Sequence, residues 1–227
     1  MTRVVALVAA RNEEGRVGPT VKAIRSIEGV DEVVVVADGG STDGTAREAV
    51  EAGARVLVAP PLTRGKGGAL DGALDRIGPA DVVLLLDADL GATAEEAAAL
   101  LPPILAGRAD LAIGVLPRQE GHGGFRVVKR TAAAAIRALT GFRAAEPLSG
   151  QRAVRREVLE SLRPLAPGFG VEVAMTVDAI RVGYRVVEVP VAMTHAATGR
   201  DLAGFVHRGR QGWDLLRAAT PRAIRRR

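Results

Sequence analysis

The chain has 227 residues, 48% of them hydrophobic and 25% charged, a composition that excludes a chain disordered throughout. It contains no cysteine, which excludes disulfides, thiolate catalysis and zinc–thiolate sites. The formal net charge is +5, but aromatic residues make up only 3%, which argues against a protein that stacks single-stranded nucleic acid. No apolar run approaches the roughly 20 residues of a membrane span and no signal-peptide pattern is present, so we expect a soluble, cytoplasmic protein.

Short apolar runs alternate with amphipathic stretches through the first half of the chain. The runs predicted as strands are 4–9, 33–36, 55–58, 82–86 and 109–115. Helices are predicted from Gly18, near 42–52, over 68–77, and from a Thr93 cap to 106. This alternation indicates a mainly parallel sheet covered by helices on both faces.

The second half of the chain is less regular. A Gly-rich loop at 117–124 is a candidate lid, and helices are predicted over 126–139, 171–182 and 202–218. Strands are predicted at 149–154 and 185–189. We find no repeat or long linker, so a single α/β domain is the simplest expectation.

Polar, acidic clusters follow three of the predicted strands. The segment 10–14 (Ala-Arg-Asn-Glu-Glu) follows the first strand, 38–45 follows the second, and Asp87-Ala88-Asp89 follows the fourth. Because ligands bind beyond the carboxyl ends of the strands in an open α/β sheet, these clusters should share one edge. Asp87 and Asp89 can hold a hard divalent cation, which can bridge a diphosphate.

Two further segments suit a nucleotide. Asp38 can accept hydrogen bonds from a base or ribose, and the glycines after it allow a ligand to approach the backbone. Asp43 has two interpretations, a ligand contact or a cap for the next helix. Lys66 lies among glycines before a helix, where it can meet phosphate. The spacing is not that of a P-loop, and no Gly-x-Gly-x-x-Gly follows the first strand, so an NTPase and a dinucleotide enzyme are disfavoured.

In this order, the segments resemble the family 2 glycosyltransferases with the GT-A fold, particularly the polyprenyl-phosphate glycosyltransferase and glucosyl-3-phosphoglycerate synthase branches. The resemblance is strong to about residue 90 and weaker at 149–153 and 183–190. It implies one Rossmann-like GT-A domain over 1–227, with a nucleotide-sugar-binding half (1–115) and an acceptor half (116–227). It also implies a hexosyltransferase that uses a UDP- or GDP-sugar, Mg²⁺ or Mn²⁺, and a small or lipid-phosphate acceptor.

The resemblance also assigns roles to residues. The donor nucleotide would lie against Ala10, Asn12, Glu13, Asp38, Gly40, Lys66, Asp87 and Ala88. Asp89, more than Asp87, would hold the metal and take part in catalysis, with His195 as third ligand and His122 and His207 as alternatives. Gly39 stands where many relatives carry a second Asp, so base recognition can differ. The sequel Leu90-Gly91-Ala92 argues against a processive polysaccharide synthase.

Two kinds of acceptor remain open. An alcohol acceptor in an inverting reaction needs a carboxylate base. Glu172 matches the acidic position of many relatives, although it could equally be an ordinary acid at a helix N-terminus. A phosphate acceptor needs no base and favours arginines, for which the candidates are Arg126, Arg152, Arg200 and Arg208. Peripheral membrane contact and a homodimer are also open.

Three rival functions can be told apart by simple observations. A sugar nucleotidyltransferase shares the sheet and the metal carboxylates, but usually has a Gly-rich, basic loop after the first strand, where this chain is acidic. A noncatalytic nucleotide-sugar-binding protein would bind donor without turnover. A nucleic-acid binder would show a steep dependence of affinity on salt.

Overall fold

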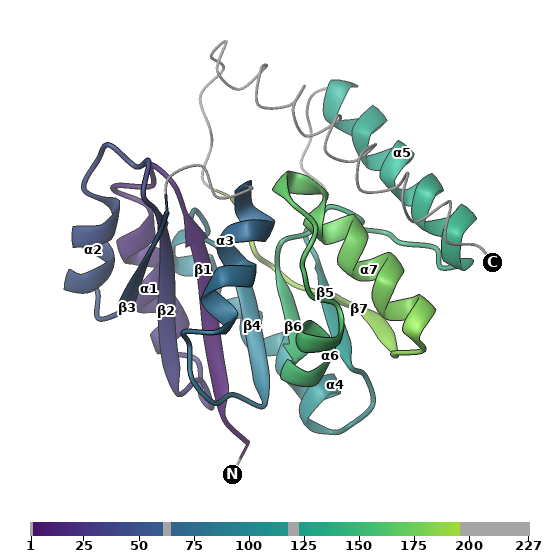
Figure 1. Ribbon diagram of the computed structural model, residues 1–227, viewed down its shortest axis with the longest axis horizontal. Helices are drawn as coiled ribbons and strands as arrows, with labels where there is room; N and C mark the ends of the chain where they lie inside the picture. The colour runs from purple at the N-terminus through teal and green to yellow at the C-terminus, as the bar shows by residue number, and fades with distance from the viewer. Residues whose placement is uncertain (1, 61–64, 118–122, 196–227) are drawn as a thin grey trace.

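A seven-stranded sheet forms the centre of the computed structural model, which describes residues 2–60, 65–117 and 123–195 (Figure 1). The strands lie in the order β3-β2-β1-β4-β6-β5-β7. They are β1 (Val4–Ala10), β2 (Glu32–Asp38), β3 (Arg55–Ala59), β4 (Val82–Asp87), β5 (Leu111–Val115), β6 (Arg152–Arg155) and β7 (Val186–Pro190). All pairs are parallel except those of β6, which runs antiparallel to both β4 and β5. The expected mainly parallel sheet is therefore confirmed.

Helices cover both faces of this sheet. The α-helices are α1 (Val17–Arg25), α2 (Thr45–Glu51), α3 (Gly65–Leu74), α4 (Leu101–Leu105), α5 (Gly123–Thr140), α6 (Arg156–Ser161) and α7 (Val171–Val182), with 3₁₀ helices η1 (Gly91–Leu100) and η2 (Gly168–Gly170). One apolar cluster joins α1, α2, η1 and α4 to one face of the sheet. A second joins α3, α6 and α7 to the other face, and α5 packs outside α7 in a third cluster.

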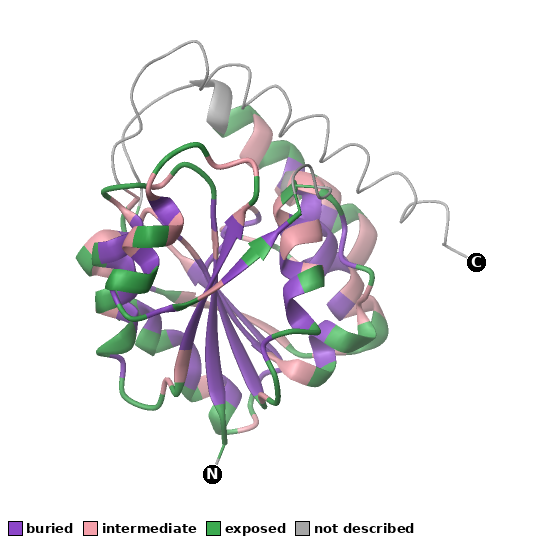
Figure 2. Cartoon of the chain, turned by 60° about the vertical axis from the view of Figure 1, so that its left-hand side comes forward, coloured by how far each residue is buried: buried purple, intermediate pink, exposed green. Residues whose placement is uncertain are grey.

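The central strands are buried on both faces, as Figure 2 shows. In β1, for example, neighbouring residues point into different clusters, Val4 and Ala6 into one and Val5 and Leu7 into the other. A strand that lies between two layers of helices has no solvent face, so its sequence is apolar at every position rather than alternating. This is why the apolar runs of the first half predicted the strands well.

Three local predictions need correction. Thr93 does not cap an α-helix: it lies inside η1, and its hydroxyl donates to the carbonyl oxygens of Leu90 and Thr194. Regular α-helix begins only at Leu101, immediately before Pro102 and Pro103, which lack the N–H needed inside a helix but are tolerated in its first turn. The short helix α6 was not predicted, and the strand expected at 149–154 is β6, which begins three residues later.

Several predicted segments lie outside the described residues. They are most of the candidate lid at 117–124, the helix at 202–218, and His122, His207, Arg200 and Arg208. Within the described parts of the chain, no helix is both long and apolar enough to cross a bilayer.

Candidate active site

The residues that follow β1, β2 and β4 meet at one edge of the sheet, as the sequence predicts. The backbone N–H of Glu13 donates to Thr45 Oγ1 at 2.8 Å, and the N–H of Thr42 donates to Asn12 Oδ1 at 2.9 Å. These contacts fasten the loop after β1 to the loop after β2. Asn12 has a positive φ of 54°, a conformation that Asn tolerates better than most residues. Such strain is often found at functional sites.

Asp38 and Asp43 have different duties in the loop after β2. Asp38 Oδ1 accepts a 2.7 Å hydrogen bond from the N–H of Gly40, and Oδ2 lies 3.7 Å from an Arg11 guanidinium nitrogen. Asp43 instead accepts hydrogen bonds from the N–H groups of Glu14 and Thr45, at 3.1 Å each. The Asp43 carboxylate is therefore occupied by hydrogen bonds within the protein, which favours its role in holding the loop over a contact with a ligand. Asp38 stays a candidate for donor recognition.

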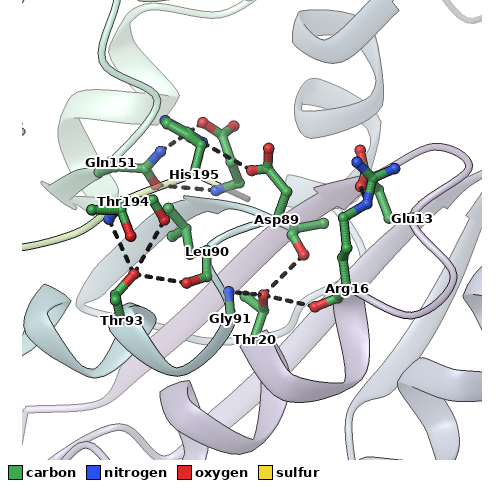
Figure 3. A network of polar contacts seen from close by, with 12 residues as sticks. Glu13, Arg16, Thr20, Asp89, Leu90, Gly91, Thr93, Gln151, Thr194 and His195 are labelled. Atoms are coloured by element: carbon green, nitrogen blue, oxygen red, sulfur yellow. Dashed lines mark hydrogen bonds and ion pairs between the residues drawn. The ribbon is translucent and has the colours of Figure 1, made fainter. Parts of the chain in front are cut away.

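Asp89 pairs with His195, a residue 106 positions away in the sequence (Figure 3). Asp89 Oδ1 lies 2.9 Å from His195 Nδ1, and the hydrogen bond raises the pKa of His195 above its ordinary value although burial opposes this. The neighbouring Thr194 is fastened to η1, because its N–H donates to Thr93 Oγ1 at 3.1 Å. The segment after β7 thus places an imidazole beside the carboxylate that follows β4.

Asp87 makes its hydrogen bonds to other partners, Lys66 of α3 and Gln151 before β6. Its Oδ1 accepts a 2.5 Å hydrogen bond from Lys66 Nζ, and its Oδ2 accepts a 2.6 Å bond from Gln151 Nε2. Burial alone would raise the pKa of Asp87, but the positive charge of Lys66 holds it below its ordinary value. Gly150 lies directly over this pair: a Cβ there would be 2.6 Å from both Asp87 Oδ2 and Lys66 Nζ.

Lys66 connects Asp87 to Glu172. Lys66 Nζ donates to Glu172 Oε1 at 2.9 Å, and Glu172 lies in the first turn of α7 with a side chain only 8% exposed. Burial would lower the pKa of Lys66, but the two carboxylates raise it above its ordinary value. A single cation is therefore shared by a carboxylate on the donor side and by the candidate base.

Glu13 reports the concentration of negative charge at this edge. Burial raises its pKa to about 7, the positive charge of Arg16 opposes the rise, and the charges of Asp89, Asp87 and Asp43 add to it. Its carboxylate forms an ion pair with Arg16, whose Nε lies 2.8 Å from Oε2. Burial is thus the main cause of the raised pKa, and the three neighbouring carboxylates add the electrostatic part that a bound cation would offset.

These residues suit a hard divalent cation, but do not enclose one. Among the residues that the structure describes, no three Asp, Glu or His side chains gather closely enough to hold a metal ion. Asp89 and His195 lie side by side, whereas Asp87 is engaged by Lys66 and Gln151. Two protein ligands are enough where a substrate's phosphates and water complete the shell, as is usual for Mg²⁺. The donor set therefore fits a metal that binds together with a diphosphate.

Sequence reasoning missed two contributors to this site. Gln151 was noted only as part of a weak resemblance, yet it also accepts a 3.1 Å hydrogen bond from the N–H of Asp87. Thr20 drew no attention, although its hydroxyl accepts from the N–H of Gly91 at 2.8 Å and shares its one proton between the carbonyl oxygens of Arg16 and Ala88, each at 2.9 Å (Figure 3). Only the burial of a threonine on the inner face of α1 could have signalled this role.

The arginines proposed for a phosphate acceptor do not gather in the described structure. Arg126 lies exposed in α5, while Arg152 is 1% exposed in the middle of the sheet. Arg152 therefore cannot contact an acceptor without rearrangement. The structure brings together Asp87, Asp89, Glu172, Lys66 and His195, and leaves these two arginines apart from one another.

Comparison with known proteins gives the family that the sequence motifs resemble. Residues 5–163 match the family model "Glycosyl transferase family 2". Glycosyltransferase AglJ of Haloferax volcanii is 32% identical over 86% of this chain and 64% of its own length. Polyprenol monophosphomannose synthase of Mycolicibacterium smegmatis is 35% identical over 73% of this chain and 68% of its own length.

The fold comparison agrees. Glucosyl-3-phosphoglycerate synthase of Mycobacterium tuberculosis, solved with Mn²⁺, UDP-glucose and phosphoglyceric acid, superposes with a TM-score of 0.79 and 29% identity, over 96% of this chain and 80% of that one. By sequence, this chain spans 59% of that synthase's length. The sheet with its helical layers has the same GT-A arrangement. The chain belongs to glycosyl transferase family 2.

Proposed function

We propose that this protein is a metal-dependent glycosyltransferase that moves a sugar from a nucleoside-diphosphate sugar to the hydroxyl group of a small phosphorylated acceptor. One observation carries the proposal: the pair Asp89–His195 lies on the same sheet edge as the ion-paired group Asp87–Lys66–Glu172. The first suits a cation and the second links a phosphate-binding lysine to a buried carboxylate. Family membership supports the same activity.

Each residue has a part in binding the donor. Asp89 and His195 would hold Mg²⁺ or Mn²⁺, which neutralises negative charge on the departing diphosphate. Lys66 would bind the phosphates, and Asp38 would accept hydrogen bonds from ribose or base, with the backbone at Ala10, Asn12, Gly40 and Ala88 around them. Relatives from Mycobacterium tuberculosis have been solved with UDP and Mn²⁺, which favours uridine over guanosine for this chain.

Glu172 would act on the acceptor. A hydroxyl acceptor must lose its proton as it attacks the sugar carbon, and a carboxylate within reach can take that proton. Glu172 is buried, lies 2.9 Å from Lys66 Nζ, and is attached to the first turn of a helix. A phosphate acceptor would not need this group. The buried carboxylate therefore supports a hydroxyl acceptor, of which phosphoglyceric acid in the M. tuberculosis enzyme is an example. A cytoplasmic location, a homodimer and peripheral membrane contact stay predictions.

The test is calorimetric titration of UDP, GDP, UDP-glucose and GDP-mannose into the wild type and into Asp89→Ala, with Mn²⁺ and with chelator. We expect metal-dependent binding of one nucleotide, lost in the variant. Arg3→Gln, at the opposite end of the sheet, is the control that should bind normally. Failure of every nucleotide to bind under any metal condition would refute the proposal. Binding without turnover would indicate the noncatalytic alternative.

A further inference from the structure

Arg152 is a fully buried cation that makes no direct ion pair with a described carboxylate. It is the first residue of β6 and lies between Leu85 of β4 and Ile113 of β5 in the pairing register. Its Nε donates to the carbonyl of Ser149 at 2.9 Å, and its Nη1 donates to Thr176 Oγ1 at 3.1 Å. In the described structure its Nη2 has no hydrogen-bond partner. An unpaired buried charge is unfavourable for stability, so its presence calls for an explanation.

A small cavity connects Arg152 with Glu172. Arg152, Lys66, Glu172 and Gly150 provide its polar part, and its volume of about 10 Å³ suits a single water molecule. The remaining lining is apolar: Leu70, Leu85, Val171 and Met175. A water in this position can accept from a guanidinium N–H and donate to a carboxylate oxygen. It would thereby satisfy one N–H of Arg152, whose Nη2 has no hydrogen-bond partner in the described structure.

A second connection runs through Thr176. Its hydroxyl accepts from Arg152 Nη1 and donates to the carbonyl oxygen of Glu172 at 2.9 Å. Thr176 is completely buried, so this link has no competition from solvent. Arg152 is thus attached to the turn of α7 that carries the candidate base.

The balance of charge also requires Arg152. Lys66 supplies one positive charge to two carboxylates, Asp87 and Glu172, and the guanidinium of Arg152 supplies the second. Burial lowers the pKa of Arg152 to about 10, and the charges of Glu172, Asp87 and Glu188 oppose the decrease. The side chain is therefore charged at neutral pH. When Lys66 turns to phosphate, Arg152 is the cation that remains beside Glu172.

We propose that Arg152 is a positioning residue for Glu172: through Thr176 and one buried water it holds the carboxylate in place while Lys66 binds the donor's phosphates. The inference rests on the proposed function, in which Glu172 accepts the proton of the acceptor hydroxyl. Arg152 would touch neither substrate. Its removal should impair the transfer step and leave donor binding intact.

The experiment measures kcat and donor affinity for Arg152→Met with UDP-glucose, phosphoglyceric acid and Mn²⁺. We expect kcat to fall about 30-fold, the range for residues that orient catalytic groups, with the donor Kd within about twofold of wild type. In a double-mutant cycle, Arg152→Met should cost less than about threefold in the Glu172→Gln background, because its partner has already lost its charge. A purely structural role would lower kcat by the same factor in both backgrounds.

Arg156→Met is the matched control. Arg156 follows the other end of β6, donates to Glu160 and to the carbonyl of Leu74, and also has one buried nitrogen without a partner. This variant should keep wild-type kcat. Arg152→Lys should recover part of the activity, because it restores the charge.

Should Arg152→Met fail to fold, Thr176→Val tests the same link at nearly constant volume, with an expected loss of about fivefold in kcat. A kcat within threefold of wild type in Arg152→Met, or equal losses in both backgrounds of the cycle, would overturn the inference and leave the proposed function standing. A wild type that binds the donor but transfers no sugar would contradict the proposed function itself, and this inference with it.

Discussion

The two halves of the sheet contribute to the site in different ways. On the side of β1, β2 and β4, the functional residues follow parallel strands, and their loops are held by hydrogen bonds to one another. On the side of β6, β5 and β7, the contributions come from residues that enter an antiparallel strand, from the first turn of α7, and from the segment after β7. The buried charges lie where the two sides meet: Asp87 and Lys66 of the first side pair with each other, and Lys66 also pairs with Glu172 of the second side.

This difference teaches that two kinds of chemistry are built separately. Cation and diphosphate binding would draw on residues after strands, Asp89 after β4 and His195 after β7, together with Lys66 in the first turn of α3. Proton transfer would need a carboxylate that is buried and oriented, and Lys66 extends from α3 to donate a hydrogen bond to Glu172. Variants on the two sides should therefore fail differently.

The largest effect is expected for Glu172→Gln. The variant keeps the shape of the side chain but removes the base, so kcat should fall about 1,000-fold. Donor affinity, a property of the other half, should stay the same in calorimetry. A decrease in kcat of less than tenfold would show that the acceptor needs no base. Glu157→Gln, an exposed acid at the start of α6, is the control.

The comparison of Asp87→Ala with Asp89→Ala separates the buried ion-paired group, Asp87–Lys66–Glu172, from the Asp89–His195 pair by stability. Asp87→Ala leaves the buried Lys66 with one carboxylate and Gln151 without its partner, so we expect the free energy of unfolding to fall by about 3 kcal/mol. Asp89→Ala removes only the contact to a half-buried histidine and should cost about 1 kcal/mol or less. Urea denaturation in the presence of chelator measures both. Equal losses would refute the distinction.

Gly150→Ala should disturb the contact between Asp87 and Lys66 without unfolding the protein. The added Cβ would press on the Asp87 carboxylate and the Lys66 ammonium, and we expect about tenfold weaker donor binding. Gly72→Ala in α3 is the control, because a Cβ there meets no atom within 4 Å. If both variants bind the donor equally well, the close approach at Gly150 has no role.

The last prediction concerns the pH dependence of stability and a residue of the donor half. The pKa of Glu13 is raised to about 7 from an ordinary 4.5, so the folded protein holds this proton more tightly than the unfolded chain does. The resulting stability is fully present below pH 4.5 and is lost as the pH rises through about 7. Between pH 5 and pH 8, the free energy of unfolding of the wild type should therefore fall, and it should fall by about 1–2 kcal/mol more than that of Glu13→Gln. Identical pH profiles of urea denaturation without metal would contradict this.

The parallel part of the fold could be predicted because its signals are local. Strands between two helical layers are apolar throughout, so the runs at 4–9 and 82–86 match β1 and β4 to within one residue. The helix at 171–182 matches α7 at both ends, where Gly183 adopts the positive φ that ends a helix. By contrast, the single helix predicted from Thr93 to 106 is divided into the 3₁₀ helix η1 and the short α-helix α4. The spacing of the residues did not indicate this division.

The sequence pointed to Lys66, Asp87 and Glu172, but their contacts with one another could not be predicted, because they join residues distant in the sequence. Asp38 and Asp89 can be found by looking at the residues that end or follow the parallel strands. Because β6 is antiparallel, it is its beginning, not its end, that lies at the same edge of the sheet. Gln151 and Arg152 precede or open that strand, where such inspection does not look. Lys66 and Glu172 are 106 residues apart, and no local pattern indicates that they meet.

Thr20 has a further consequence for the turn that carries Asp89. By bonding to Ala88 and Gly91 from within the core, it holds that turn in one conformation before any cation arrives. A ligand that meets a preorganised turn loses little entropy in ordering it, so more of the interaction energy appears as affinity. At the proposed metal site, part of this preorganisation would therefore come from a helix residue that does not bind the metal.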